Sequence, residues 1–328
     1  MVADLNKDAK LDVATISVDG SLDVLLGNGN GTLKAPVSTP VASGGGAGLL
    51  VADVNNDGNA DLVISIVRSG FGTMLGRGDG TFAAFTLAIG AGTEGGLAAA
   101  DFNNDGKLDV AFSLYNPIVA VTFGNGDGTF QQFPPSYQTT ANTYGLVLAD
   151  LNRDGRRDIV TSGGGAVGVL LGNSDGTFPL DGMTFPLDSG VTVSSVAVGD
   201  LNGDGLVDVV APDSGAITVN IFLGKGDGTL LAATQAGSGQ SPTDVKITDM
   251  NLDGKPDIVV ANDISGNPSF VTVLSGKGDG TFDPFRSFAT GVSSHSVAVG
   301  DLNADGLPDL VVANRSQGGL SVLLNTSH

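Results

Sequence analysis

A nine-residue acidic motif that recurs seven times is the feature that most constrains how this chain can fold. Each copy follows the pattern Asp-x-Asn-x-Asp-Gly-x-x-Asp, and we call the copies acidic loops 1 to 7 and their positions 1 to 9. Ala9 in loop 1 stands where the other six copies have glycine. The loops start at Asp4, Asp53, Asp101, Asp150, Asp200, Asp249 and Asp301, with spacings of 49, 48, 49, 50, 49 and 52 residues. A period that fills the chain predicts a single repetitive domain over residues 1–328.

Each repeat contains the signals for four β-strands. In residues 196–242, the apolar runs "VAVGD" and "VDVVAP" flank the acidic loop, and "ITVNIFLG" is a third candidate strand. The turn "KGDGT" contains an Asp-Gly pair that tolerates positive φ, and it leads into a more polar fourth strand, "LLAATQ". No segment has the amphipathic 3.6-residue period and the cap of a helix. The sequence predicts an all-β fold, a seven-bladed β-propeller of four-stranded antiparallel blades, rather than a β-solenoid, whose coils are usually shorter.

The repeat also defines the expected blades. Their approximate ranges are 1–46, 47–95, 96–144, 145–193, 194–242, 243–294 and 295–328. A hairpin motif related to Gly-x-Gly-Asp-Gly-Thr follows the third strand in six repeats and is missing from the seventh. We therefore expect the last blade to lack its outer strand, and the protein to be a monomer or part of a larger chain.

The acidic loops have the ligand spacing of a calcium site. Side-chain oxygens at positions 1, 3, 5 and 9, a main-chain carbonyl at position 7 and a glycine at position 6 suit a hard cation with six to eight oxygen ligands. Calcium fits better than magnesium, which prefers a small octahedral shell with retained water. The chain has no Cys and only 2 His for softer metals. We expect up to seven structural Ca²⁺ ions, each fastening the first strand of a blade to the second.

The predicted metal ligands occupy positions 1, 3, 5, 7 and 9 of each loop. They are Asp4, Asn6, Asp8, Lys10 and Asp12; Asp53, Asn55, Asp57, Asn59 and Asp61; Asp101, Asn103, Asp105, Lys107 and Asp109; Asp150, Asn152, Asp154, Arg156 and Asp158; Asp200, Asn202, Asp204, Leu206 and Asp208; Asp249, Asn251, Asp253, Lys255 and Asp257; and Asp301, Asn303, Asp305, Leu307 and Asp309.

Loops 1 and 4 are expected to bind calcium more weakly than the others. Ala9 must adopt a backbone conformation that favours glycine. In loop 4, Arg153, Arg156 and Arg157 reduce the attraction for a cation. We nevertheless expect all seven loops to be occupied.

Composition limits the partners and the location of the protein. Its 15 Lys+Arg and 35 Asp+Glu residues give a formal net charge of -20, which makes nucleic acid a poor partner. No apolar run reaches the roughly 18 residues that a membrane-spanning helix needs, so we expect no membrane insertion. Calcium sites of modest affinity fill at the millimolar calcium found outside cells, and we therefore expect a secreted or cell-surface protein.

These motifs resemble the FG-GAP/VCBS repeat family, which includes the β-propellers of integrin α subunits and bacterial secreted or surface proteins. Asp53, Asn55, Asp57 and Asp61 match the calcium ligands of that family, as do the equivalent residues of the other copies. The resemblance implies a seven-bladed propeller with calcium loops on one face, partners on the opposite face, and a role in adhesion or recognition.

The segments that do not repeat indicate where a partner binds. On the face expected to lie opposite the acidic loops, polar and aromatic residues gather around blades two to four, and all 3 tyrosines are among them. Amphipathic aromatic side chains beside amides suit contacts with a sugar or a protein, although filling of a loop core also explains them. The candidate ligand-binding residues are Arg68, Phe71, Glu94, Tyr115, Asn116, Tyr137, Asn142 and Tyr144.

Three functions fit the sequence, in this order of preference. The first is a calcium-stiffened extracellular module for binding or adhesion, with a protein or glycan ligand. The second is a carbohydrate-binding, lectin-like propeller, and the third is a polysaccharide lyase or hydrolase. Glu94 is the only glutamate, His295 is the only histidine inside the repeats, and most aspartates belong to the acidic loops. Few residues are left for acid-base chemistry, so we expect no enzymatic activity.

Overall fold

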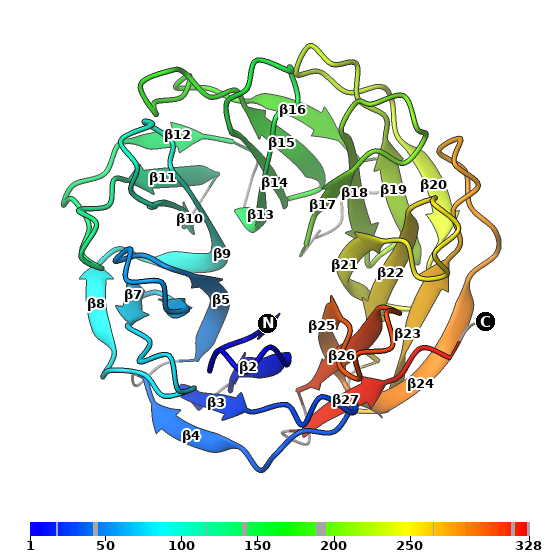
Figure 1. Cartoon of the computed structure of the whole chain (residues 1–328). Helices are drawn as coiled ribbons and strands as arrows, with labels where there is room; N and C mark the ends of the chain where they lie inside the picture. The colour runs from blue at the N-terminus through cyan, green and yellow to red at the C-terminus, as the bar shows by residue number, and fades with distance from the viewer. Residues whose placement is uncertain are drawn as a thin grey trace.

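A computed structural model describes residues 1–17, 19–41, 45–115, 117–139, 143–187, 195–264, 266–315 and 319–326. In this part of the chain the strands form seven antiparallel sheets, which stand side by side in a ring around a central axis (Figure 1). The described residues contain no helix, and thus none long and apolar enough to span a membrane. The arrangement confirms the all-β, seven-bladed propeller that the repeat predicts.

Each sheet is one blade, and its strands follow one another in chain order from the centre of the ring to the rim (Figure 1). Blades 1 to 3 contain β1 (Val2–Ala3), β2 (Asp12–Ile16), β3 (Ser21–Leu25) and β4 (Val37–Pro40); β5 (Gly46–Ala52), β6 (Asp61–Ile66), β7 (Gly70–Met74) and β8 (Thr86–Ile89); and β9 (Thr93–Ala100), β10 (Asp109–Leu114), β11 (Ile118–Thr122) and β12 (Ser136–Gln138).

Blades 4 to 7 continue the same order. They contain β13 (Thr143–Ala149), β14 (Asp158–Gly163), β15 (Ala166–Leu170) and β16 (Met183–Pro186); β17 (Ala197–Gly199), β18 (Asp208–Asp213), β19 (Thr218–Phe222) and β20 (Thr234–Gly237); β21 (Pro242–Thr248), β22 (Asp257–Asn262), β23 (Pro268–Leu274) and β24 (Arg286–Val292); and β25 (Ser294–Gly300), β26 (Asp309–Asn314) and β27 (Gly319–Leu323).

The second strand of a blade is buried on both of its faces. All six residues of β6, β18 and β22 are buried. Each of these strands packs against the neighbouring blade on either side, so no position of the strand faces water. This explains why sequences such as "DIVVAN" in β22 are apolar without the alternation of a half-exposed strand.

Hydrophobic clusters fill the spaces between neighbouring blades. Between blades 2 and 3, the rings of Phe112 and Phe130 lie 4.9 and 5.4 Å from that of Phe71, measured between centroids. Between blades 7 and 1, the hydrophobic cluster of the described residues has only three buried members, Val13, Leu302 and Val311. Because apolar stabilisation scales with buried area, the ring gains least from packing where its two ends meet.

Several inner strands begin earlier than the sequence boundaries of the blades. β9 starts at Thr93 and β13 at Thr143, whereas the predicted blades start at 96 and 145. The register of β13 with β14 shifts between Thr143 and Gly145, so this strand contains a bulge. A bulge adds a residue that cannot be counted from the acidic loop alone.

Backbone hydrogen bonds join neighbouring blades on the face that carries the acidic loops. In the hairpin motifs of blades 2, 3, 5 and 6, the glycine before threonine donates its N–H to the carbonyl at position 2 of the acidic loop in the preceding blade, as Gly80 does to Leu5 at 3.1 Å. In blade 4, Gly176 bonds instead to Asn173 of its own turn. Gly31 of blade 1 makes the same bond to Leu302 of blade 7 at 3.0 Å, which closes the ring. Equivalent bonds join Gly128 to Val54, Gly228 to Leu151 and Gly280 to Leu201.

Blade 7 has three strands within the described residues, as the missing hairpin motif predicts. Asn325 makes two of the hydrogen bonds that the hairpin motif makes in other blades. In blade 5, Gly224 at the start of the hairpin motif donates its N–H to Asp208 at 2.8 Å. In blade 7 the N–H of Asn325 makes the equivalent bond to Asp309 at 2.7 Å. The side-chain amide of Asn325 also donates to the position 2 carbonyl of Met250 in blade 6, at 2.6 Å. One asparagine therefore fastens blade 7 to its own loop and to its neighbour.

We expect Asn325→Ala to lower the free energy of unfolding by about 1–2 kcal/mol, because the substitution leaves the Met250 carbonyl without its amide donor. Urea unfolding monitored by circular dichroism measures the change. Thr326→Ala, at the exposed neighbouring residue, is the control and should change stability by less than about 0.5 kcal/mol. Equal stability of the two variants would contradict the role of Asn325.

Candidate functional site

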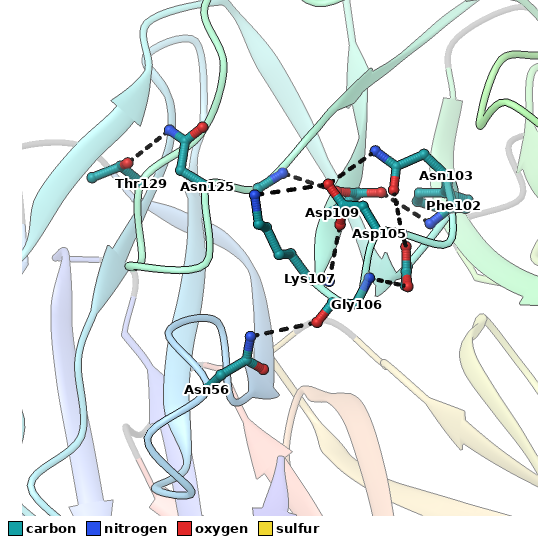
Figure 2. A network of polar contacts seen from close by, with 11 residues as sticks. Asn56, Phe102, Asn103, Asp105, Gly106, Lys107, Asp109, Asn125 and Thr129 are labelled. Carbon is teal, nitrogen blue, oxygen red and sulfur yellow. Dashed lines mark hydrogen bonds and ion pairs between the residues drawn. The ribbon is translucent and has the colours of Figure 1, made fainter.

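Six of the acidic loops share one hydrogen-bonding pattern, which Figure 2 shows for loop 3, and loop 5 differs only in that Asp200 Oδ1 accepts the N–H of Gly203 at position 4. The two carboxylate oxygens of Asp101 accept the N–H groups of Asp105 and Gly106 at 3.0 and 2.8 Å. Asn103 Oδ1 accepts the Asp105 N–H at 2.9 Å, and Asp105 Oδ1 accepts the Lys107 N–H at 3.0 Å. The side chains at positions 1, 3 and 5 are thus turned toward the inside of a tight backbone turn.

Two residues in every acidic loop have a left-handed backbone. At position 6, Ala9 has a φ of 62°, so the alanine adopts the conformation that the other loops reach with glycine. Position 4 is also left-handed, although only one copy has glycine there, and each non-glycine residue in this region costs about 1–2 kcal/mol. The position 4 residues are Lys7, Asn56, Asn104, Arg153, Gly203, Leu252 and Ala304, with φ between 57° and 75°. This strain cannot be recognised from the sequence, because the residue type at position 4 varies freely.

The aspartate at position 9 is a buried bridge. Asp208 is 0% exposed, and its Oδ2 accepts the N–H of Leu201 at 2.8 Å while its Oδ1 accepts that of Gly224 at 2.8 Å. The carboxylate therefore ties the start of the acidic loop to the end of the third strand. A Cβ atom on Gly224 would lie 2.2 Å from the Val207 carbonyl oxygen, which explains why the hairpin motif begins with glycine.

The same two bonds recur in all seven loops, at 2.7 to 3.0 Å. Burial raises the pKa of the position 9 carboxyl in loops 1 to 6, because the loss of hydration outweighs the two N–H bonds. These aspartates are Asp12, Asp61, Asp109, Asp158, Asp208, Asp257 and Asp309, and none is more than 1% exposed.

The donors of each loop fit a hard cation in their chemistry. All are oxygens, and a carboxylate oxygen that accepts one N–H keeps a second lone pair. The described residues contain no group of three Asp, Glu, His or Cys side chains placed to hold a metal ion. Each loop therefore presents several oxygen atoms around one tight turn, and in this structure those oxygens accept hydrogen bonds from backbone N–H groups of the loop. The calcium ligands predicted from the sequence stay a prediction.

Cationic side chains approach the position 5 carboxylate in three loops. Lys10 Nζ lies 3.8 Å from Asp8 Oδ2, and Lys107 Nζ lies 3.9 Å from Asp105 Oδ2. In loop 4 the Arg156 guanidinium bonds directly to Asp154. Loop 4 thus differs from the others in the charge that surrounds its carboxylates.

A surface cavity of about 530 Å³ lies where blades 3 and 4 meet, beside loops 3 and 4. It is lined by Ala99, Ala100, Asp101, Leu148 and Arg157. Arg157 occupies position 8, which is apolar in the other six loops. From the sequence alone, Arg157 stands out only by its charge, and no local pattern indicates a cavity beside it.

Four of the eight predicted ligand-binding residues lie partly or fully at the surface. The Arg68 Nε donates to the Tyr115 hydroxyl at 2.7 Å, and its guanidinium carbon lies 5.9 Å from the centroid of that ring. Both residues lie between the second and third strands of their blades, on the face opposite the acidic loops. The backbone N–H of Arg68 bonds to the Thr93 carbonyl, and that of Tyr115 bonds to the Gly92 carbonyl. Glu94 follows Thr93 in the inner strand β9 and is half-buried. Tyr144, in the inner strand of blade 4, is half-buried.

Two of the predicted ligand-binding residues are core residues instead. Phe71 is 0% exposed, and Tyr137 is 3% exposed with its ring 5.4 Å from that of Phe178. Their predicted place on the surface is therefore wrong, because each aromatic ring fills the space between two blades. Asn116 and Asn142 lie outside the described residues.

The sequence profile of the FG-GAP-like repeat matches residues 4–64, 150–211, 200–260 and 249–312, which is more than half of the chain. The protein therefore belongs to the FG-GAP repeat family. No curated protein matches the chain.

Several solved structures have a similar fold. A lectin of Agrocybe aegerita, described as recognising non-reducing terminal N-acetylglucosamine, is 23% identical with a TM-score of 0.61 over 97% of this chain and 85% of its own. BBS1N, in a complex with ARL6DN, is 9% identical with a TM-score of 0.67 over 100% and 92%. A putative 6-phosphogluconolactonase of Bacteroides uniformis is 14% identical with a TM-score of 0.70 over 95% and 90%. At these identities the similarity supports the propeller fold alone.

We expect Asp208→Asn to lower the free energy of unfolding by about 2–3 kcal/mol, because the new amide NH₂ must face a backbone N–H that the carboxylate now accepts. Urea unfolding with a chelator present measures this loss without any contribution from a bound cation. Asp227→Asn is the matched control, since Asp227 is exposed and accepts bonds from Thr229 through one oxygen only. A cost for Asp208→Asn no greater than that of the control would disprove the bridging role.

Proposed function

We propose that this protein is a calcium-stabilised propeller that acts outside the cell as a binding or adhesion module. The observation that carries the proposal is the sevenfold recurrence of one left-handed turn with the same oxygen donors. In six of the seven loops a non-glycine residue at position 4 strains the backbone, and such strain persists only if something compensates for it. A cation shared by the carboxylates of a loop supplies that compensation.

The chain's own residues define how each site would work. Positions 1, 3 and 5 offer side-chain oxygens, and position 7 offers a carbonyl. Position 9 adds a carboxylate that is already fixed to the backbone, as Asp208 is through Leu201 and Gly224. Bound calcium would neutralise the repulsion between these carboxylates. The acidic loop would then hold the first and second strands of its blade together.

The expected affinity supports an extracellular location. Sites with dissociation constants of about 0.1 mM, exposed to about 1 mM free calcium, each stabilise the fold by about 1.4 kcal/mol. The calcium concentration inside a cell is far too low to fill sites of this affinity. The benefit of the acidic loops is therefore available only outside the cell.

The face opposite the acidic loops is the proposed ligand surface. Arg68 of blade 2 and Tyr115 of blade 3 meet there, and their mutual hydrogen bond fixes an exposed aromatic ring beside a cation. A pre-ordered ring of this kind loses little entropy when it contacts a protein or a sugar. We infer binding rather than catalysis, because most aspartates belong to the loops and Glu94 is the only glutamate.

We expect calcium removal to lower the melting temperature by at least about 10 °C, since several sites each contribute about 1 kcal/mol. Differential scanning calorimetry in 1 mM Ca²⁺ and in excess chelator measures the shift. Mg²⁺ at the same concentration is the control and should restore less than half of the difference. A melting temperature that does not respond to calcium would refute the proposed stabilisation.

A lectin is the second candidate function, because the ring of Tyr115 is exposed and ordered and because a lectin of similar fold recognises a terminal N-acetylglucosamine. In this case a glycan array should show binding that Tyr115→Ala weakens at least tenfold. Val37→Ala, at an exposed apolar residue of the rim strand β4, is the control and should bind as before. An array without any bound glycan would favour a protein ligand instead.

A further inference from the structure

Loop 4 contains its own cation in the position where a metal would act. The Arg156 guanidinium bonds to the Asp154 carboxylate through Nη2, and its Nε donates to the Gly172 carbonyl at 2.8 Å. The N–H of Gly172 in turn bonds to Asp158 at 2.9 Å. One side chain thus neutralises position 5 and ties the acidic loop to the end of the third strand.

Two hydrogen bonds to Asp154 Oδ2 leave this oxygen without a free lone pair. Oδ2 accepts both the Asn152 amide, at 2.7 Å, and the Arg156 guanidinium, while Oδ1 accepts the Arg156 N–H at 2.9 Å. An oxygen with two donors cannot also coordinate a metal ion. Asp154 is also the best covered of the position 5 residues that have a cation beside them, with a side chain 20% exposed, against 33% for Asp8 and 37% for Asp105.

The charge of loop 4 also differs from that of its six counterparts. Its three aspartates are balanced by Arg153, Arg156 and Arg157, so the nine residues are formally neutral. Loop 1 has a formal charge of -1, loops 3 and 6 have -2, and loops 2, 5 and 7 have -3. A divalent ion would bring these six loops close to neutrality, but it would leave loop 4 with +2 around three guanidinium groups.

Loop 4 nevertheless has the same backbone as the other loops. Asp150 accepts the N–H groups of Asp154 and Gly155 at 3.0 and 2.9 Å, and Arg153 has the left-handed φ of 60° that marks position 4. Loop 4 therefore forms the same turn as the other loops although arginines balance the charge of its carboxylates.

We propose that Arg156 replaces the metal in loop 4, so that the propeller binds six calcium ions and closes its fourth blade without calcium. This inference rests on the proposed function for the other six loops. It differs from the expectation from the sequence that all seven loops are occupied.

Calcium stoichiometry tests the proposal directly. The whole protein is dialysed against 2 mM Ca²⁺, and bound calcium is counted by elemental analysis. We expect six ions for the natural sequence and seven for Arg156→Leu, since leucine already occupies position 7 in loops 5 and 7. Lys107→Leu in loop 3 is the matched control and should still bind six.

The outcomes separate the two proposals. Seven ions in the natural sequence, or six in Arg156→Leu, would overturn the role of Arg156 while calcium binding stands. A protein that binds no calcium would overturn the proposed function and the count of six with it.

Hydrogen exchange in excess chelator gives a second readout that needs no bound metal. We expect the amides of Asp154, Gly155 and Arg156 in loop 4 to exchange at least tenfold more slowly than their equivalents in loop 2, which are Asp57, Gly58 and Asn59. Arg156→Leu should remove this difference without unfolding β14 or β15. Equal exchange in loops 2 and 4 of the natural sequence would contradict a metal-independent closure.

Discussion

The propeller depends on a buried carboxylate that bridges two backbone N–H groups in every blade. The aspartate at position 9 joins the beginning of its acidic loop to the end of the third strand, and Asp208 with Leu201 and Gly224 is one example. In six of the blades the position 2 residue held in this way presents its carbonyl to the next blade, as Leu5 does to Gly80. The carboxylate thus organises each sheet and also the contact between sheets. A buried carboxylate without these donors would lower the stability of the fold. The conformation of the acidic loop, the glycine of the hairpin motif and the contact with the next blade therefore depend on one another.

The acidic loops combine like charges with strained backbone, and the chain compensates for both in two ways. In six loops we propose an external cation, because their formal charge stays negative and their position 5 carboxylate has at most a lysine at 3.8 or 3.9 Å beside it. In loop 4 the Arg156 guanidinium reaches Asp154 and Gly172, so the cation is part of the chain. The stability of six blades would then depend on the calcium concentration. In blade 4, Arg156 would still join the acidic loop to Gly172 at low calcium.

Much of the fold was readable from the sequence because the repeat is long, regular and rich in turn signals. The acidic loop marks the start of the second strand and the hairpin motif marks the end of the third, so seven blades and a three-stranded last blade followed directly. The starts of β9 and β13 did not follow, since bulged inner strands have no marker residue. The candidate loops were likewise found from residue type and spacing. The left-handed position 4 was not, because residues as different as Lys7 and Leu252 adopt it.

By itself, the sequence determined the architecture and the oxygen-rich chemistry of the loops, because both depend on short-range patterns of residue type. Tertiary structure decided which side chains meet. It buried Phe71 and Tyr137 between blades, although both are near polar segments in the sequence. It also brought Asn325 to the carbonyl of Met250, 75 residues earlier in the chain. Such contacts depend on how neighbouring blades pack, and no local pattern contains that information.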